Sequence, residues 1–432
     1  MTQHFHPLRT NRDLALAIAI LVLAAASSAS GQEASNTSLP PGWVPQTPTG
    51  LVAEPPLLKK LMNASDGVMT YDAAPKDGLY AELGDMITGA GWISAGPGYR
   101  FHVLNKRAFV DASAAVSWNI YKVAQTRFEF PHLAHDRLVV GAQAMYQDVV
   151  QVDYFGTGPD SLEAGESAYR FNNYDVLGYT TVRPATWFSV NGRVGWLVSP
   201  NLSTATGRNV TVPNTIDLFD ESTAPGLLTQ PTFLHADASI AADWRDHAGH
   251  PTRGGLYRAT ITTYSDRDAG TYTFRRYEVE AAQFVPLFTN KWILALHGWE
   301  VFSDASSGRL VPFYLMPSLG GQNTLRGYSD YRFHDSDMQV FNAESRWALF
   351  AHIDAAVFVD TGKVAPRAGD LDFKHMRRSY GAGLRLHNAT STLGRLDVGH
   401  GAEGWRVIFK ISDPFKRGTP AFGRSSVAPF VP

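Results

Sequence analysis

Between about residues 78 and 415, apolar and polar side chains alternate in segments of about ten residues that turn-forming residues separate. In one such segment, Val190 and Trp196 share a face, opposite Asn191 and Arg193. Successive side chains of a β-strand point to opposite faces of the sheet. Each segment therefore predicts a strand with one apolar and one polar face, a pattern typical of transmembrane β-barrels.

About sixteen strands of this kind can be placed along the chain. Their expected bounds are 77–85, 91–102, 107–118, 121–131, 137–154, 169–183, 186–199, 232–245, 254–265, 273–288, 292–303, 337–349, 353–362, 378–387, 393–400 and 404–415. An even number of antiparallel strands returns both ends of a barrel to the same side of the membrane. The expected domain is thus a barrel that closes near Phe415.

The connections between these strands alternate in length. Short turns are expected at 289–291, 350–352 and 388–390, and longer polar stretches at 200–231, 303–335 and 363–378. Outer-membrane barrels have short periplasmic turns and long outer loops. A soluble sandwich or barrel would show the same periodicity with its apolar face buried. Aromatic strand ends and charged residues on the presumed inner face favour an all-β fold, a transmembrane antiparallel β-barrel of about 16 strands.

The first residues have the organisation of a signal peptide. Arg9 and Arg12 form a positive region, an apolar run covers 14–26, and small residues occupy 27–31. The apolar run is shorter than the roughly 20 residues of a membrane-spanning helix. An uncleaved anchor is the alternative interpretation. We expect a cleaved signal peptide at 1–31 and export to the bacterial outer membrane.

Composition and periodicity divide the rest of the chain into three parts. Residues 32–77 are rich in Pro, Ser, Asn and Gly without sustained periodicity, so they predict a periplasmic arm or linker. Residues 78–415 form the expected barrel domain. Residues 416–432 follow as a polar C-terminal tail that contains Pro and Gly.

Composition narrows the possible functions. Charged residues make up 18% of the chain and aromatic residues 12%, and the formal net charge is -2. A near-neutral protein without a basic surface is not expected to bind nucleic acid. Cysteine is absent, which excludes disulfides, cysteine nucleophiles and thiolate metal sites.

The candidate chemistry lies in one long loop and the strands that follow it. The inward faces of these strands place Glu344 and Asp360 in an acidic patch that Arg346 and Arg385 flank. A cation from the loop that dips into the lumen finds a partner there, and the planar fork of an arginine suits bidentate binding of a carboxylate. The long segment 317–328 contains one arginine, Arg326. The alternative is that Arg326 is a solvated loop residue and Asp360 a lumen charge paired with Arg346 or Arg385.

Several motifs resemble those of the bacterial surface antigen family, the barrel superfamily of BamA, TamA and the two-partner secretion transporters. In that family, a loop ending in Arg-Gly-Tyr or Arg-Gly-Phe folds into the lumen and docks on a Phe-x-Asp-x-Gly strand. The matching positions are Gly320, Gly321, Arg326, Gly327 and Tyr328 in the loop, Phe358, Asp360 and Gly362 on the strand, and Glu344 and Arg346 on the strand before it. Residues 243–246, 251–254 and 154–158 are also similar to family turn and strand-end motifs. Family barrels commonly end on an aromatic residue that assembly machinery reads, and Phe415 matches this, with Trp405 and Phe409 before it.

The resemblance implies a function in outer-membrane protein assembly or translocation. The implied partners are outer-membrane lipid, unfolded outer-membrane or secreted polypeptides, and the barrel assembly machinery during biogenesis. Family members that insert or translocate proteins usually carry POTRA modules before the barrel, and residues 32–77 are too few for one such module. A passive porin-like channel and a purely structural surface antigen are the alternatives. A weak first strand, Gly78–Asp85, favours a seam that opens laterally.

No enzyme active site, metal site or cofactor is expected. His247 and His250 lie close together in a predicted turn, but the sequence offers no clear third ligand. No Gly-x-Ser-x-Gly motif marks a nucleophile. An outer-membrane lipase with its catalytic groups on the barrel wall is the alternative, because such triads are recognised by geometry rather than by sequence.

Overall fold

The computed structural model describes residues 50–65, 77–84 and 94–415, apart from 209, 290 and 389. The expected signal peptide and C-terminal tail lie outside the described residues, as does most of the expected arm. The strands of the main sheet are β1 (Gly78–Gly84), β2 (Ser94–Val103), β3 (Ala108–Ser117), β4 (Lys122–Leu133), β5 (Leu138–Tyr154), β6 (Ser167–Ala185), β7 (Phe188–Thr204), β8 (Phe233–Asp243), β9 (Gly254–Asp266), β10 (Phe274–Pro286), β11 (Trp292–Ala305), β14 (Asp337–Ala348), β15 (Ile353–Ala365), β16 (Arg377–His387), β17 (Thr392–Gly401) and β18 (Gly404–Lys410). The other elements are α2 (Pro56–Ser65), α3 (Thr215–Leu218), β12 (Ser318–Leu319), β13 (Phe333–His334) and three 3-10 turns at Glu163–Gly165, Phe313–Leu315 and Ala368–Asp370.

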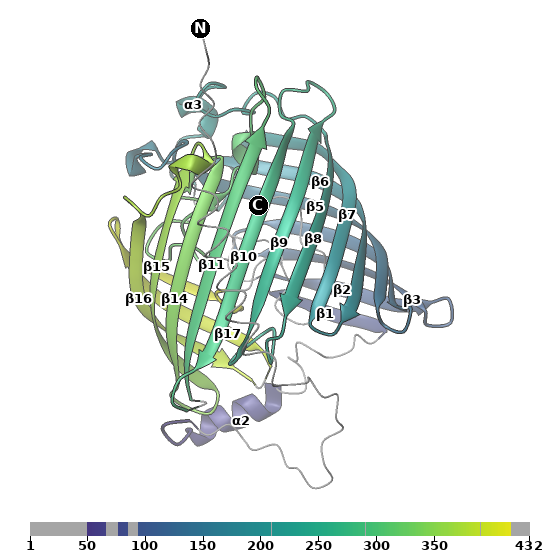
Figure 1. Ribbon diagram of the computed structural model, residues 1–432, viewed down its shortest axis with the longest axis vertical. Helices are drawn as coiled ribbons and strands as arrows, with labels where there is room; N and C mark the ends of the chain where they lie inside the picture. Colours follow the sequence, from purple (N-terminus) through teal and green to yellow (C-terminus); the bar gives the residue numbers. More distant parts are fainter. Residues whose placement is uncertain are drawn as a thin grey trace, which may run out of the picture. The chain divides into compact units, whose positions relative to one another are not determined.

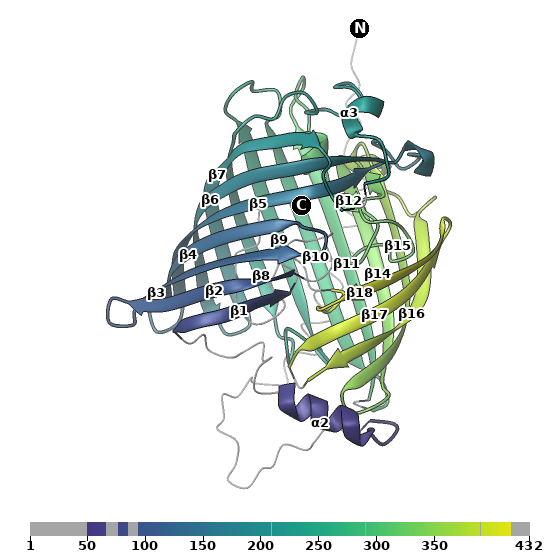
Figure 2. The same ribbon diagram turned by 180° about the vertical axis from the view of Figure 1, so that it is seen from behind.

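These sixteen strands form one antiparallel sheet in which each strand pairs with its neighbours in sequence, β14 following β11 in the order. The strands run side by side and tilted around a curved wall, with β1 and β18 at its two edges (Figure 1; Figure 2). The expected all-β barrel fold is confirmed. The sheet contains a strand at each of the sixteen expected places, because residue alternation at period two reports a half-buried strand directly.

The strand faces divide as the alternation predicts. On β7, the outward side chains of Val190, Val194 and Trp196 are 38%, 55% and 42% exposed. The inward side carries many buried charged residues instead, which is the inverse of a soluble sandwich. Among the described residues, no helix has the length and apolarity needed to cross a bilayer.

Part of the expected irregular arm is ordered against the end of the barrel that carries the short turns. The amide of Leu51 donates to the carbonyl of Ala348 (2.8 Å), and Glu54 lies 2.8 Å from Nδ1 of His352. Helix α2 follows at once. Pro56 occupies its first position, where a missing N–H group costs nothing. The sequence did not predict this helix, because ten residues are too few to show a helical period clearly.

The connection between β11 and β14, residues 306–336, folds into a compact structure. Strands β12 and β13 pair as a short antiparallel hairpin within it. Side chains of this loop form a buried apolar cluster with the inner faces of β11, β14 and β15: Val301, Leu319, Leu325, Tyr328, Phe333, Met338, Val340 and Val364. The loop is therefore held by its own apolar core as well as by polar contacts.

Candidate functional site in the barrel interior

The tip of the loop is shaped by two adjacent glycines. Gly320 and Gly321 have φ angles of +120° and +83°, which side-chain-bearing residues rarely adopt. The amide of Gly321 donates to the carbonyl of Tyr328 (3.1 Å), and the amide of Gly320 donates to Oγ1 of Thr324 (2.8 Å). This tight turn directs Arg326 toward the wall of the barrel.

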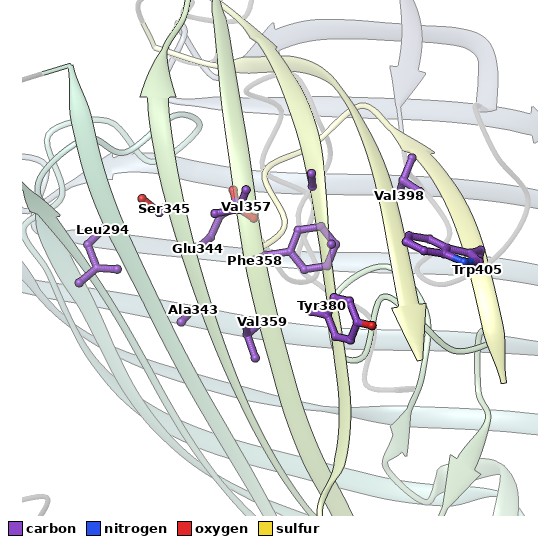
Figure 3. A pocket seen from close by; sticks show the side chains of 12 residues that line it. Leu294, Ala343, Glu344, Ser345, Val357, Phe358, Val359, Tyr380, Val398 and Trp405 are labelled. Atoms are coloured by element: carbon purple, nitrogen blue, oxygen red, sulfur yellow. The ribbon is translucent and has the colours of Figure 1, made fainter. Parts of the chain in front are cut away.

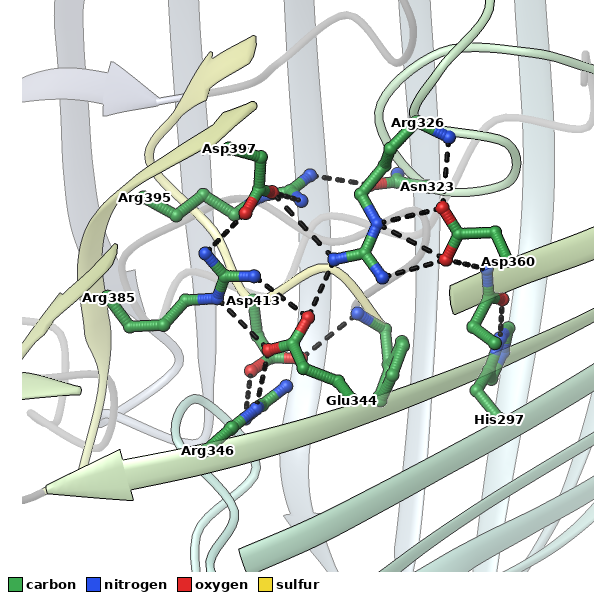
Figure 4. A network of polar contacts seen from close by, with 12 residues as sticks. His297, Asn323, Arg326, Glu344, Arg346, Asp360, Arg385, Arg395, Asp397 and Asp413 are labelled. Atoms are coloured by element: carbon green, nitrogen blue, oxygen red, sulfur yellow. Dashed lines mark hydrogen bonds and ion pairs between the residues drawn. The ribbon is translucent and has the colours of Figure 1, made fainter. Parts of the chain in front are cut away.

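Arg326 is fully enclosed and contacts two carboxylates at once (Figure 4). Its Nη2 and Nε donate to Oδ1 and Oδ2 of Asp360 at 2.7 and 3.1 Å, and its own amide donates to Oδ2 at 3.0 Å. Its Nη1 donates to Oε2 of Glu344 at 2.6 Å. Burial alone would lower the pKa of the Arg326 guanidinium, but Asp360 and Glu344 raise the pKa well above its ordinary value. Arg326 is therefore a fixed positive charge.

The register of the sheet explains why these carboxylates meet the loop together. Asn342, Asp360 and Ser379 pair across β14, β15 and β16, and all three face inward. Asn342 Nδ2 and Ser379 Oγ both donate to Asp360, at 2.9 Å each. The neighbours on both sides thus orient the carboxylate, so that its two oxygens face the loop.

The Phe-x-Asp-x-Gly strand supplies more than the carboxylate. The guanidinium carbon of Arg326 lies 3.5 Å from the ring centroid of Phe358, a cation–π contact. A Cβ added at Gly381, opposite Phe358 on β16, would lie 2.5 Å from that ring, so glycine is required for the ring to lie flat there. A Cβ at Gly362 would lie 2.9 Å from Leu319 of the loop. The motif therefore provides an aromatic ring that contacts the guanidinium, a carboxylate that pairs with it, and the space beside Gly362 that Leu319 of the loop occupies.

Gly327 and Tyr328 pack the loop against β17. A Cβ added at Gly327 would lie 2.5 Å from the backbone of His400 and Gly401, so only glycine permits this approach. The hydroxyl of Tyr328 accepts a hydrogen bond from the amide of Ala402 (3.3 Å). The Arg-Gly-Tyr sequence therefore contacts three strands, with each residue making a different kind of contact.

The Omp85 superfamily domain matches residues 105–400, well over half of the 432-residue chain. The chain belongs to the Omp85 superfamily. The family expected from the loop and strand motifs is therefore confirmed. No curated protein matches this chain by sequence.

The fold of this Omp85 barrel is similar to that of BamA from Haemophilus ducreyi lacking POTRA domains 1–3, with a TM-score of 0.58 and 16% identity. That similarity covers 78% of this chain and 70% of the other. CdiB from Escherichia coli has a TM-score of 0.50 and 14% identity, over 78% of this chain and 63% of that one. This chain thus spans less than two thirds of that CdiB chain, and at these identities the similarity is one of fold.

Glu344 is the centre of a larger ion cluster in the Omp85 barrel (Figure 4). Arg385 binds it in a bidentate way at 3.1 and 2.8 Å, and Nε of Arg346 donates to it at 2.8 Å. The contacts continue to residues that the sequence interpretation missed: Arg395, Asp397 and Asp413. The alternation of inward and outward side chains that identified Glu344 could also have identified Asp397, because Asp397 lies between the outward Leu396 and Val398.

The C-terminal aromatic residues differ from expectation. Trp405 and Phe409 lie on β18 and point outward, 66% and 42% exposed. The last strand ends at Lys410, however, not at Phe415. The chain then turns inward, where Asp413 binds Nη1 of Arg346 (2.8 Å) and Phe415 is buried.

Phe415 is held inside by aromatic and apolar contacts. Its ring stacks on His297 with centroids 5.1 Å apart and packs with Leu256, Ala282, Phe284, Ile293 and Ala295 of β9, β10 and β11. Burial alone would raise the pKa of Asp413, but Arg346 lowers it below its ordinary value. The segment after β18 is therefore fixed to the same ion cluster as the loop.

A shallow groove lies on the opposite, outward face of the same strands (Figure 3). It is lined by Val357 and Val359 of β15, Tyr380 of β16 and Trp405 of β18, which are 46–66% exposed. In a barrel that spans a membrane, outward apolar side chains face lipid. The groove therefore lies on the outward surface of the wall and is not a second interior site.

Proposed function

We propose that this protein is an exported outer-membrane barrel that inserts or transports polypeptides through a lateral seam between β1 and β18. Membership of the Omp85 superfamily and a BamA-like fold support the general function. The observation that carries the proposal is the state of the two sheet edges. Among the described residues, β1 pairs only with β2, and β18 only with β17.

Both edges are short compared with the rest of the wall. β1 and β18 each have 7 residues, whereas β6 has 19. At about 3.3 Å per residue, such an edge offers roughly 23 Å of backbone. An unpaired edge presents a row of N–H and C=O groups that an incoming strand can bind by β-augmentation. The seam therefore suits a polypeptide in extended conformation.

The inward turn after Lys410 keeps this edge short. Residues 411–415 would extend β18 along β17 if they continued in the sheet. Instead, Asp413 and Phe415 bind the interior wall. In the proposed function, the ion cluster holds the loop docked on the wall and also holds the end of the last strand away from the seam.

The test is to lock the seam with a disulfide. The chain has no cysteine, so a cysteine pair placed between Gly78–Gly84 and Gly404–Lys410 forms a single defined crosslink. Purified protein in liposomes is assayed for the rate at which it folds a small outer-membrane barrel substrate or imports an unfolded polypeptide. We expect the oxidised pair to abolish the activity and a reductant to restore it.

A matched control crosslinks two strands that are already paired. Ala95 and Val116 are register partners on β2 and β3, so a disulfide between them does not change the seam. This control should keep the wild-type rate in both redox states. A locked seam that works as fast as the control would exclude lateral opening.

A further inference from the structure

The turn between β8 and β9 crosses to the turn between β16 and β17, although these strands are not neighbours in the sheet. The amide of Thr392 donates to the carbonyl of Gly249 (3.0 Å), and a Cβ added at Gly249 would lie 2.7 Å from the carbonyl oxygen of Thr390. We call residues 244–253 the strap. It reaches β17 at the end of the barrel that carries the short turns.

A compact group of three side chains lies where the strap meets the wall. His250 belongs to the strap, Asp354 to β15 and His387 to the end of β16, and all three are buried. Nε2 of His250 lies 3.4 Å from Oδ2 of Asp354, and Nε2 of His387 lies 3.2 Å from Oδ1. One possible ligand atom from each residue lies within 4.8 Å of the others. The spacing of histidines in the sequence gave no sign of this group, because its members are more than a hundred residues apart or on different strands.

A hydrogen bond on the far side of the His387 ring determines which of its nitrogens carries the hydrogen. Nδ1 of His387 lies 3.0 Å from the carbonyl oxygen of Asn388, which only accepts, so Nδ1 carries the hydrogen. Nδ1 of His250 pairs with Oγ1 of Thr392 at 3.3 Å. Metal-binding histidines characteristically donate their second N–H to a backbone carbonyl or another fixed acceptor in this way.

On the inner side of the group, a neutral His387 places an acceptor against an acceptor, because its Nε2 lone pair faces Oδ1 of Asp354 at 3.2 Å. Oδ2 of Asp354 is buried and accepts no hydrogen bond from any described residue. Protons on both rings would place two cations in a stack whose centroids are 3.8 Å apart. One divalent cation would satisfy all three groups.

We propose that His250, Asp354 and His387 bind one divalent transition-metal ion of the Zn²⁺ class, which clamps the strap to β15 and β16. Two imidazoles and one carboxylate are a common ligand set for zinc, with the fourth position left to water. In a tetrahedral site with bonds of about 2.0–2.1 Å, neighbouring ligand atoms lie roughly 3.3–3.4 Å apart. The three possible ligand atoms here lie within 4.8 Å of one another, so small side-chain shifts bring them to that spacing. The two rings are nearly parallel, at 11°, so they must tilt apart when the ion enters.

The test uses the full-length protein in detergent micelles, stripped of metal with a chelator and titrated with Zn²⁺. We expect one Zn²⁺ per chain by metal analysis after dialysis, and a tetrahedral visible spectrum when Co²⁺ replaces it. At free Zn²⁺ 100 times the dissociation constant, the equilibrium population of the open strap should fall about 100-fold. Hydrogen exchange at the Thr392 amide measures that opening.

Variants separate this site from other histidines. Asp354→Asn and His250→Gln should each lose the bound ion. His247→Gln changes the same strap outside the group and should bind as wild type does. Heat-modifiable electrophoretic mobility shows whether each barrel is folded. If Asp354→Asn fails to fold, His250→Gln still tests the site, because His250 lies outside the strands. Folded wild type that retains no Zn²⁺ would overturn the proposal, as would equal loss in His247→Gln.

Discussion

Replacing Arg326 with methionine tests the docking of the loop most directly. In this variant, Glu344 keeps its contacts with Arg346 and Arg385, so its charge stays compensated. Asp360 does not, because Arg326 is the one cation that contacts it among the described side chains. The uncompensated charge therefore falls on Asp360, a fully buried carboxylate that keeps its hydrogen bonds to Asn342, Ser379 and the backbone amide of residue 326.

Removing one partner from a buried ion pair costs about 3–5 kcal/mol. This cost applies to the docked loop, since undocking lets water reach Asp360. At 1.4 kcal/mol per factor of ten, docking should weaken roughly a hundred- to several-thousand-fold. Hydrogen exchange at the amides of Gly321 and Tyr328, which bond within the loop tip, should accelerate by a similar factor. Conductance in planar bilayers, which we expect to be low and flickering in the wild type, should rise in the variant.

Two further variants make the result specific. Adding Asp360→Asn removes the uncompensated carboxylate charge, so the loop should dock better in the double variant than in Arg326→Met alone. Arg367→Met removes an arginine whose side chain is 83% exposed and should change neither exchange nor conductance. If Arg326→Met leaves loop exchange and conductance at wild-type values, the ion pair does not hold the loop and the reasoning fails. Steady, large conductance in the wild type would instead indicate a passive channel.

Three other predictions follow from the same geometry. Gly381→Ala should lower the free energy of unfolding by about 1–3 kcal/mol through overpacking against Phe358 and the Val398 carbonyl, as urea unfolding can measure. Gly178→Ala is the control and should be neutral, because no atom lies nearer than 3.9 Å to the added Cβ. Asp413→Asn should free residues 411–415, so that a protease cleaves beside Phe415 in the variant but not in the wild type. Burial raises the pKa of Asp335 to about 6, above its value in the unfolded chain, so Asp335 stabilises the docked loop more at pH 5 than at pH 7. Burial lowers the pKa of the neighbouring His334 to about 3, which has the opposite pH dependence, so the Asp335 contribution is the difference between wild type and Asp335→Asn. Hydrogen exchange at the Gly158 amide, which bonds to His334, measures it after correction for intrinsic rates: the protection lost in Asp335→Asn should be larger at pH 5 than at pH 7.

The strands and the inward placement of Glu344 and Asp360 were predictable from sequence for a common reason. Both depend on which face of a strand a residue occupies, and period-two alternation reports that face directly. Arg326 was identified as their partner from the resemblance of its loop motif to that of the family. Glu344 and Asp360 were assigned inward by parity alone, and the structure shows them on the inner wall. Asp413 was beyond this rule, because it lies where the chain has left the sheet and no alternation applies. The group of His250, Asp354 and His387 was equally hidden, because a turn brings it together across strands that do not pair.

The ion cluster links two parts of the barrel that are separate in the sheet. Arg326 brings the loop to Glu344, and Arg346 connects the same Glu344 to Asp413 beyond the last strand. Among the described residues, freeing Asp413 leaves Glu344 as the one carboxylate in an ion pair with Arg346, which strengthens the competition between Arg346 and Arg326 for Glu344. Charges this close in a dry interior interact far more strongly than in water. Release of Asp413 beside the proposed seam should therefore change the free energy of loop docking. This coupling between the last strand and the loop requires no wider movement of the wall.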